Sequence, residues 1–164
     1  KHNLGFVYEA QKRIPQAIKW YEEAEQIYSK HLPYSHTDNA TILNNLGSCY
    51  ALLGDFDTAE KYLVEALAIC RSILPQLPVD TATSINSLAT LYKVQNRLAE
   101  SQTLFVEALQ IVETALNADH PVRILVMNNY NSFMKKVKLL KLTRKATSKQ
   151  SEGLSGIVDD FFAG

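Results

Sequence analysis

The sequence is poor in several features that mark whole classes of protein. Six glycines and five prolines in 164 residues are too few for a turn-rich β fold and favour helices. The two cysteines, Cys49 and Cys70, form no C-x-x-C motif, so we expect buried free thiols in a reducing compartment rather than a disulfide scaffold. No apolar run approaches the roughly 18 residues that a membrane-spanning helix needs. These absences predict a helical, cytoplasmic domain.

The chain also lacks net charge, since it holds 17 basic and 17 acidic residues. A general attraction to nucleic acid or to a membrane surface is therefore not expected. The charges are nevertheless segregated, because residues 135–149 carry seven basic side chains and no acidic one. This basic stretch is open to two interpretations. It could be the solvated end of a last helix, or a surface that contacts phosphates or a protein partner.

A short motif recurs every 42 residues. Its four copies are HNLGFVY (2–8), NNLGSCY (44–50), NSLATLY (86–92) and a decayed NNYNSFM (128–134). Ala24, Ala66 and Ala108 keep the same register in the second half of each unit. A fixed period of this length indicates an array of stacked structural units. Because the first residues already look like the inside of a helix, we expect the chain to be a fragment of a longer protein.

Each unit is predicted to form two helices. In the second unit, apolar residues recur at helical spacing on both sides of GDFD (54–57). Gly54 suits the C-terminal cap of the first helix, and Asp55 or Asp57 suits the start of the second. Small residues such as Gly47 and Ala66 would let the two helices approach closely. The expected helices span roughly 1–12, 15–31, 37–53, 56–73, 79–95, 98–116 and 121–142.

The residues at fixed places in the unit identify its type. Leucine followed by glycine at 46–47, Tyr50, and then Ala59 and Ala66 form a pattern that resembles the tetratricopeptide repeat. The 42-residue length, the asparagine pair and DHP (119–121) resemble its kinesin-light-chain type. The resemblance implies an all-α fold, a right-handed α-solenoid of antiparallel helix hairpins. The implied units are about 1–36, 37–78, 79–120 and a partial fourth at 121–138. Residues 139–164 are expected to form a basic helix end, a Gly/Ser turn at 149–156 and an acidic-aromatic tail.

The same resemblance implies a function. In the kinesin-light-chain type, the first helix of each hairpin lines a concave groove, so we predict a protein–protein interaction scaffold that binds a peptide or partner segment there. The implied groove residues are Asn44, Ser48, Thr83, Asn86, Thr90, Lys93, Asn128, Ser132 and Lys135. The alternative is a purely architectural module at the end of a larger motor-adaptor or signalling protein.

The asparagine column has two physical uses. Carboxamides offer donors and an acceptor, so a ladder of them could pair with the backbone of an extended peptide. They could instead bond from one hairpin to the next and set the geometry of the array. We favour the first use for Asn44, Asn86 and Asn128, and the second for Asn45 and Asn129.

The C-terminal tail supplies a second hypothesis. Asp159, Asp160, Phe161 and Phe162 have the acidic and aromatic character of the peptides that kinesin-light-chain grooves accept. The tail could therefore dock in its own groove or mediate self-association.

Catalysis finds no support in the sequence. The four histidines are scattered at helix starts and ends, and none pairs with a cysteine or carboxylate at a metal-ligand spacing such as H-E-x-x-H. His120 fits a helix-start turn instead. We therefore expect no enzyme, no metal, no cofactor and no small-molecule substrate.

Overall fold

The computed structural model describes residues 5, 8–9, 11–31, 33, 36–72 and 78–162, with side chains described up to residue 143. The helices are α2 (Ile14–His31), α3 (Thr37–Leu53), α4 (Phe56–Ser72), α5 (Pro78–Val94), α6 (Leu98–Ala115) and α7 (Pro121–Phe162). The chain forms two compact units, Lys1–Asn129 and Tyr130–Gly164. All the regular elements among the described residues are helical, which confirms the predicted all-α class.

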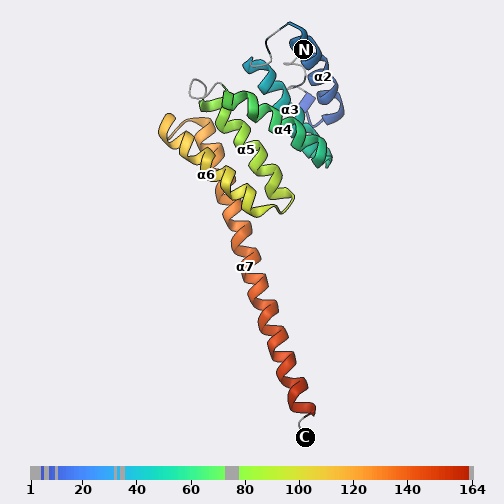
Figure 1. Ribbon diagram of the computed structural model, residues 1–164, viewed down its shortest axis with the longest axis vertical. Helices are drawn as coiled ribbons and strands as arrows, with labels where there is room; N and C mark the ends of the chain where they lie inside the picture. Colours follow the sequence, from blue (N-terminus) through green and yellow to red (C-terminus); the bar gives the residue numbers. More distant parts are fainter. Residues whose placement is uncertain are drawn as a thin grey trace. The chain divides into compact units, whose positions relative to one another are not determined.

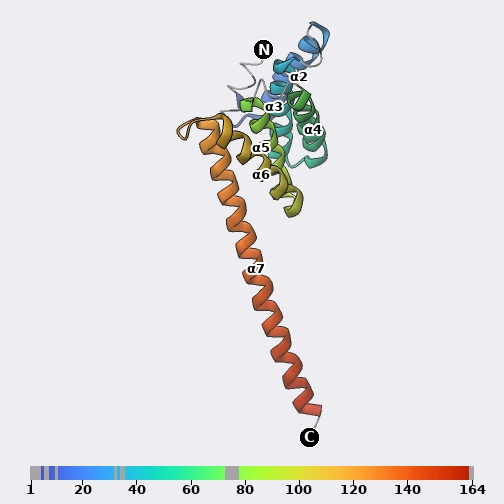
Figure 2. The same cartoon turned by 60° about the vertical axis from the view of Figure 1, so that its left-hand side comes forward.

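The helices of the first unit pack as adjacent antiparallel pairs. Helix α3 packs against α4 and α5 against α6, while α2 contacts α3 and α4 contacts α5 (Figures 1 and 2). Helices α3 and α5, the first helices of consecutive hairpins, also touch each other. The observed boundaries of α2 to α6 lie within about two residues of those that the repeat predicts, as is usual for helix ends. The helix predicted over residues 1–12 falls mostly on residues outside the described part of the chain.

Small residues facing large ones hold each hairpin together. A Cβ added at Gly47 would lie 2.6 Å from Leu63 Cγ, so only glycine lets these two helices approach so closely. The same relation joins Gly5 to the Tyr21 ring 42 residues earlier, again at 2.6 Å. Leu63 and Tyr21 are both fully buried. The leucine–glycine signature of the repeat is therefore a packing signal.

The turn between α3 and α4 follows the predicted capping. Gly54 has a left-handed backbone with φ of 84°, and its N–H bonds to the carbonyl of Ala51 at 3.1 Å. Glycine adopts this conformation without the Cβ clash that other residues meet. Asp55 Oδ1 accepts a hydrogen bond from the Thr58 N–H at 3.2 Å and so caps the start of α4. Of the two aspartates that the sequence offers for this cap, the structure thus uses Asp55.

Two histidines of equivalent repeat position start helices. The Nδ1 atom of His36 accepts from the N–H of Asp38 at the start of α3, and His120 Nδ1 accepts from Val122 at the start of α7, both at 3.2 Å. Each imidazole satisfies a backbone donor that has no partner inside the helix. His120 therefore belongs to a helix-start turn, as the sequence indicates.

The last helix is longer than expected. The sequence favours an end near residue 142 and a turn at 149–156, but α7 runs from Pro121 to Phe162 without interruption. Glycine and serine weaken a helix by at most about 1 kcal/mol each, and elongation adds one hydrogen bond for every residue fixed. The glycine and serine residues at 149–156 therefore do not end the helix, and the predicted turn there is wrong. The first compact unit ends at residue 129, and the end of the repeat array at 138 stays a prediction.

Candidate functional site

Two cavities open along the line where α3 and α5 meet, which we call the α3–α5 seam. The larger has a volume of about 320 Å³ and lies toward the C-terminal ends of both helices; we call it the apolar cavity. Its lining residues are Ser48, Ala51, Leu52, Phe56, Leu63, Asn86, Ser87, Thr90, Leu91, Val94 and Asn129. The smaller, the polar cavity, has a volume of about 100 Å³ and lies toward the N-terminal ends. It is lined by Ala40, Thr41, Asn44, Asn45, Cys70, Asp80, Thr83 and Ser84.

Exposed aliphatic side chains flank the apolar cavity. Leu52 is 66% exposed and Val94 is 50% exposed, although both are large apolar residues. They occupy the same place in successive repeats, 42 residues apart. Neither residue was predicted as part of the site. The sequence alone does not show whether an apolar side chain near a helix end is buried in the core or exposed beside a cavity. Their matched positions were the signal that could have found them.

The structure distributes the predicted groove residues over several places. Ser48, Asn86 and Thr90 line the apolar cavity, and Asn44 and Thr83 line the polar cavity.

The other predicted residues lie outside these cavities. Lys93 is half-buried on α5, and Asn128 is exposed on the first part of α7. Ser132 and Lys135 are exposed on α7 in the second compact unit. The side chains of the tail residues Asp159, Asp160, Phe161 and Phe162 lie outside the described part of the chain.

One pair of the asparagine column is bonded inside the fold. Asn129 Nδ2 donates to Asn86 Oδ1 at 3.0 Å, and Asn86 is only 4% exposed. This bond joins the hairpin of α5 and α6 to the start of α7. Asn129 thus takes the inter-hairpin role that the sequence favours for it. The oxygen of Asn86 is used in the same bond, so Asn86 has a structural role in addition to its place in the cavity wall.

The preceding pair of the column is incomplete. Asn44 is equivalent to Asn86, and Ser87 is equivalent to Asn129, at a spacing of 42 residues. Serine is shorter than asparagine and has no terminal NH₂ group. Asn44 Oδ1 is buried and, among the described residues, has no hydrogen-bond partner. The seam therefore has an unsatisfied acceptor where the next seam has a bonded amide pair.

Tyrosines of the repeat motif tie each hairpin to the preceding one. The hydroxyl of Tyr50 donates to Glu22 of α2, and that of Tyr92 donates to Glu60 of α4, both at 2.8 Å. In each case the glutamate lies on the second helix of the preceding hairpin. The tyrosine of the repeat signature therefore has a bonding role as well as a packing role.

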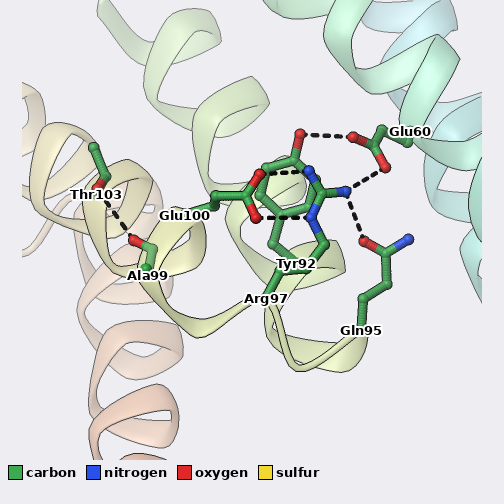
Figure 3. A network of polar contacts seen from close by, with 7 residues as sticks. All are labelled: Glu60, Tyr92, Gln95, Arg97, Ala99, Glu100 and Thr103. Carbon is green, nitrogen blue, oxygen red and sulfur yellow. Dashed lines mark hydrogen bonds and ion pairs between the residues drawn. The ribbon is translucent and has the colours of Figure 1, made fainter.

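An arginine completes the second of these links, as Figure 3 shows. The guanidinium of Arg97 lies over the Tyr92 ring, with Cζ 3.7 Å from the ring centroid. It also bonds to Glu60 at 2.6 Å and to both carboxylate oxygens of Glu100. The hydrogen bond that Arg97 donates lowers the pKa of Glu60, and the hydrogen bonds to Glu100 and Glu60 raise the pKa of Arg97. Both groups stay ionised, which suits a structural link between hairpins rather than proton transfer. We call this link of Glu60, Tyr92, Arg97 and Glu100 the clamp.

The two thiols are core residues. Cys49 and Cys70 are almost completely buried, and burial raises the pKa of both. A buried thiol of raised pKa is a poor nucleophile. Within the described part of the chain, no group of three or more histidine, cysteine, aspartate or glutamate residues could hold a metal ion. None of the helices described there is long and apolar enough to cross a membrane.

Comparison with known families identifies the repeat. Models of the tetratricopeptide repeat match residues 1–72 and residues 81–122, which together make up more than half of the chain. The chain is a tetratricopeptide-repeat protein. The matched segments include all of α3 and all but the first three residues of α5. No curated protein matches this tetratricopeptide-repeat chain.

Solved structures share the fold at low sequence identity. BtubC (BKLC) from P. vanneervenii is 22% identical with a TM-score of 0.67 over 90% of this chain. A putative kinesin light chain with nearly identical TPR-like repeats from Podosopora anserina is 21% identical, with a TM-score of 0.57 over 91%. A substituted form of the same Podosopora anserina protein gives a TM-score of 0.59 over 92%. The chain spans 62% of the length of BtubC and 74% of the two others. This chain therefore shares its repeat fold with kinesin-light-chain-like proteins.

Proposed function

We propose that this tetratricopeptide-repeat array is a protein–protein interaction scaffold that binds an extended segment of a partner along the α3–α5 seam. The observation that carries the proposal is the apolar cavity, where exposed Leu52 and Val94 flank a hollow with polar groups in its wall. Burying such exposed aliphatic surface under a partner would contribute about 25 cal/mol for each Å² removed from water. A cytoplasmic location fits this role and is likewise a proposal.

The wall of the cavity suits a peptide rather than a purely apolar ligand. Ser48, Asn86 and Thr90 line it together with the aliphatic residues. Thr90 donates its own hydroxyl proton to the carbonyl of Asn86 at 2.8 Å, which leaves its oxygen as an acceptor. An extended peptide brings backbone N–H groups that need such acceptors once they are buried.

The proposal is tested by peptide selection followed by a matched pair of substitutions. Peptides would be selected from a phage-displayed library of random dodecapeptides against the 164-residue protein, and their affinities measured by fluorescence polarisation. Val94→Glu places a charge at the apolar cavity, whereas Val106→Glu places one at a similarly exposed valine on α6. We expect at least tenfold weaker binding for Val94→Glu and unchanged binding for Val106→Glu. Equal effects of the two substitutions would favour the architectural alternative.

The tail remains a proposed competitor for the seam. Asp159, Asp160, Phe161 and Phe162 are the candidates that the sequence supplies. Removal of residues 150–164 should raise the affinity for a selected peptide if the tail docks in the array. Unchanged affinity would exclude self-docking and leave the binding proposal intact.

A further inference from the structure

We propose that the polar cavity of the α3–α5 seam is a binding pocket for a primary ammonium group, and that the partner's side chain there is a lysine. This inference rests on the proposed function, because it names the kind of residue that a partner segment would place in the seam. The hydrogen-bonding capacity of the cavity wall supports it.

Two hydroxyl groups in the wall have already used their protons. Thr41 donates to the carbonyl of Thr37 at 3.1 Å, and Thr83 donates to the carbonyl of Val79 at 2.8 Å. A threonine hydroxyl has one proton and two lone pairs. What these two oxygens can still offer to a ligand is therefore an acceptor.

A third acceptor is without a hydrogen-bond partner in the described part of the chain. Asn44 lines the cavity, and its Oδ1 atom is buried without a hydrogen bond among the described residues. The donor that completes the equivalent pair, Asn129, is replaced by Ser87 in this seam. A buried polar atom left unsatisfied costs about 1–3 kcal/mol, so a ligand that donates to it recovers that energy.

The fourth acceptor carries a negative charge. Asp80, in the first turn of α5, is half-buried in the wall of the cavity. Among the described residues, no lysine, arginine or histidine pairs with its carboxylate. The wall also holds Asn45 and Ser84, whose amide and hydroxyl groups can donate as well as accept. Its one anionic and three neutral acceptors nevertheless favour a ligand that donates. Lysine has three donors, no acceptor and a positive charge.

The size of the cavity agrees with this ligand. A volume of about 100 Å³ holds roughly three groups of the size of a water molecule, which take about 30 Å³ each. This matches an ammonium group with two methylenes. Ala40 and Cys70 in the wall are almost completely buried and supply apolar contact for the methylene stem.

The apolar cavity fixes the spacing of the partner's residues. On each helix, the two sets of residues that line the cavities are centred seven to eight positions apart, or about 11 Å at 1.5 Å per residue. An extended chain covers this distance in three to four residues. The partner segment should therefore carry a lysine three or four positions from an aliphatic residue.

The pocket can be tested without any knowledge of the partner. n-Butylammonium chloride imitates a lysine side chain, and tetramethylammonium chloride carries the same charge with no N–H donor. We expect n-butylammonium to give saturable NMR shifts of the Asn44 side-chain amide and the Thr83 backbone amide, and tetramethylammonium to give none. Equal shifts with both cations, or none with either, would overturn the pocket.

Substitutions identify the groups that bind. Asp80→Asn should weaken n-butylammonium binding about tenfold, as loss of a hydrogen bond to a charged group implies. Asp57→Asn, at an exposed site in the first turn of α4, should leave binding unchanged. Thr83→Val keeps the shape of the side chain and removes one acceptor, so it should also weaken binding. Because it leaves every charge in place, it keeps the test valid if Asp80→Asn disturbs the start of α5. An unchanged affinity in both cavity variants would contradict the assignment.

The selected peptides separate this inference from the proposed function. Replacement of their lysine by norleucine, which removes the ammonium and keeps the stem, should cost about tenfold in affinity. Peptides that are sensitive to Val94→Glu but indifferent to norleucine would uphold partner binding and refute the lysine pocket. Saturable n-butylammonium binding with no peptide selected would support the pocket and refute the scaffold.

Discussion

The carboxamide nitrogen of Asn129 lies 3.0 Å from the carboxamide oxygen of Asn86 and donates a hydrogen bond to it across two consecutive repeats. The equivalent residues of the preceding seam are Ser87 and Asn44, and there the oxygen of Asn44 is buried without a partner among the described residues. The two equivalent seams thus differ in this hydrogen bond. That difference can be manipulated, and it underlies the first two predictions.

Ser87→Asn should complete the missing amide pair. The new side chain would supply the donor that Asn44 Oδ1 lacks, and one such bond is worth about 1 kcal/mol in the free energy of unfolding. Urea denaturation followed by circular dichroism would measure the gain. The same substitution in an Asn44→Ala background should give no gain. A stabilisation that persists there would show that the new asparagine acts through some other contact.

Asn86→Ala should destabilise the array, because it removes an existing bond and leaves the amide of Asn129 without that acceptor. We expect a loss of about 1 kcal/mol in the free energy of unfolding. Asn128→Ala is the matched control, since Asn128 is exposed and exposed substitutions usually change stability by less than about 0.5 kcal/mol. Similar losses in both variants would argue against a structural role for the amide pair.

The clamp around Glu60 should make stability depend on pH. Hydrogen bonding from Arg97 lowers the pKa of Glu60 in the folded state, so its stabilising contribution is complete above the unfolded value of about 4.3. That contribution is lost as the pH falls through the lower folded value. Urea denaturation between about pH 7 and pH 3 should therefore show a smaller acid-induced loss for Glu60→Gln than for the unsubstituted chain.

Glu113 provides the comparison for this experiment. It is exposed on α6, so Glu113→Gln should leave the acid-induced loss as large as in the unsubstituted chain. An acid response that is the same in all three proteins would mean that Glu60 does not couple to folding.

The thiols should be protected by the fold. Burial raises the pKa of Cys49 to about 12 and also raises the pKa of Cys70, so at about pH 8 both thiols are mostly protonated in the folded chain. A chromogenic disulfide reagent should react slowly with the thiols of the native protein. In urea, it should react rapidly with both thiols. Fast reaction of one thiol under native conditions would show that its helix opens locally.

Much of the hairpin architecture can be predicted from the sequence, because its determinants are local or recur at a fixed interval. Gly54 and Asp55 encode a turn through backbone conformation and capping. Gly47 encodes a close helix approach because its partner Leu63 follows at a constant distance along the chain, as Tyr21 follows Gly5. The true end of α7 escaped prediction, since composition at 149–156 only weakly opposes a helix that is already formed.

The sequence alone therefore determined that this chain forms stacked helix hairpins with a 42-residue period. It did so because helical periodicity, small-to-large packing and capping act between residues close together in the chain. The tertiary structure alone decided which asparagines of the column are bonded and which remain available, and that Leu52 and Val94 flank a cavity instead of filling a core. Those outcomes depend on side chains from neighbouring repeats that meet only once the hairpins are stacked.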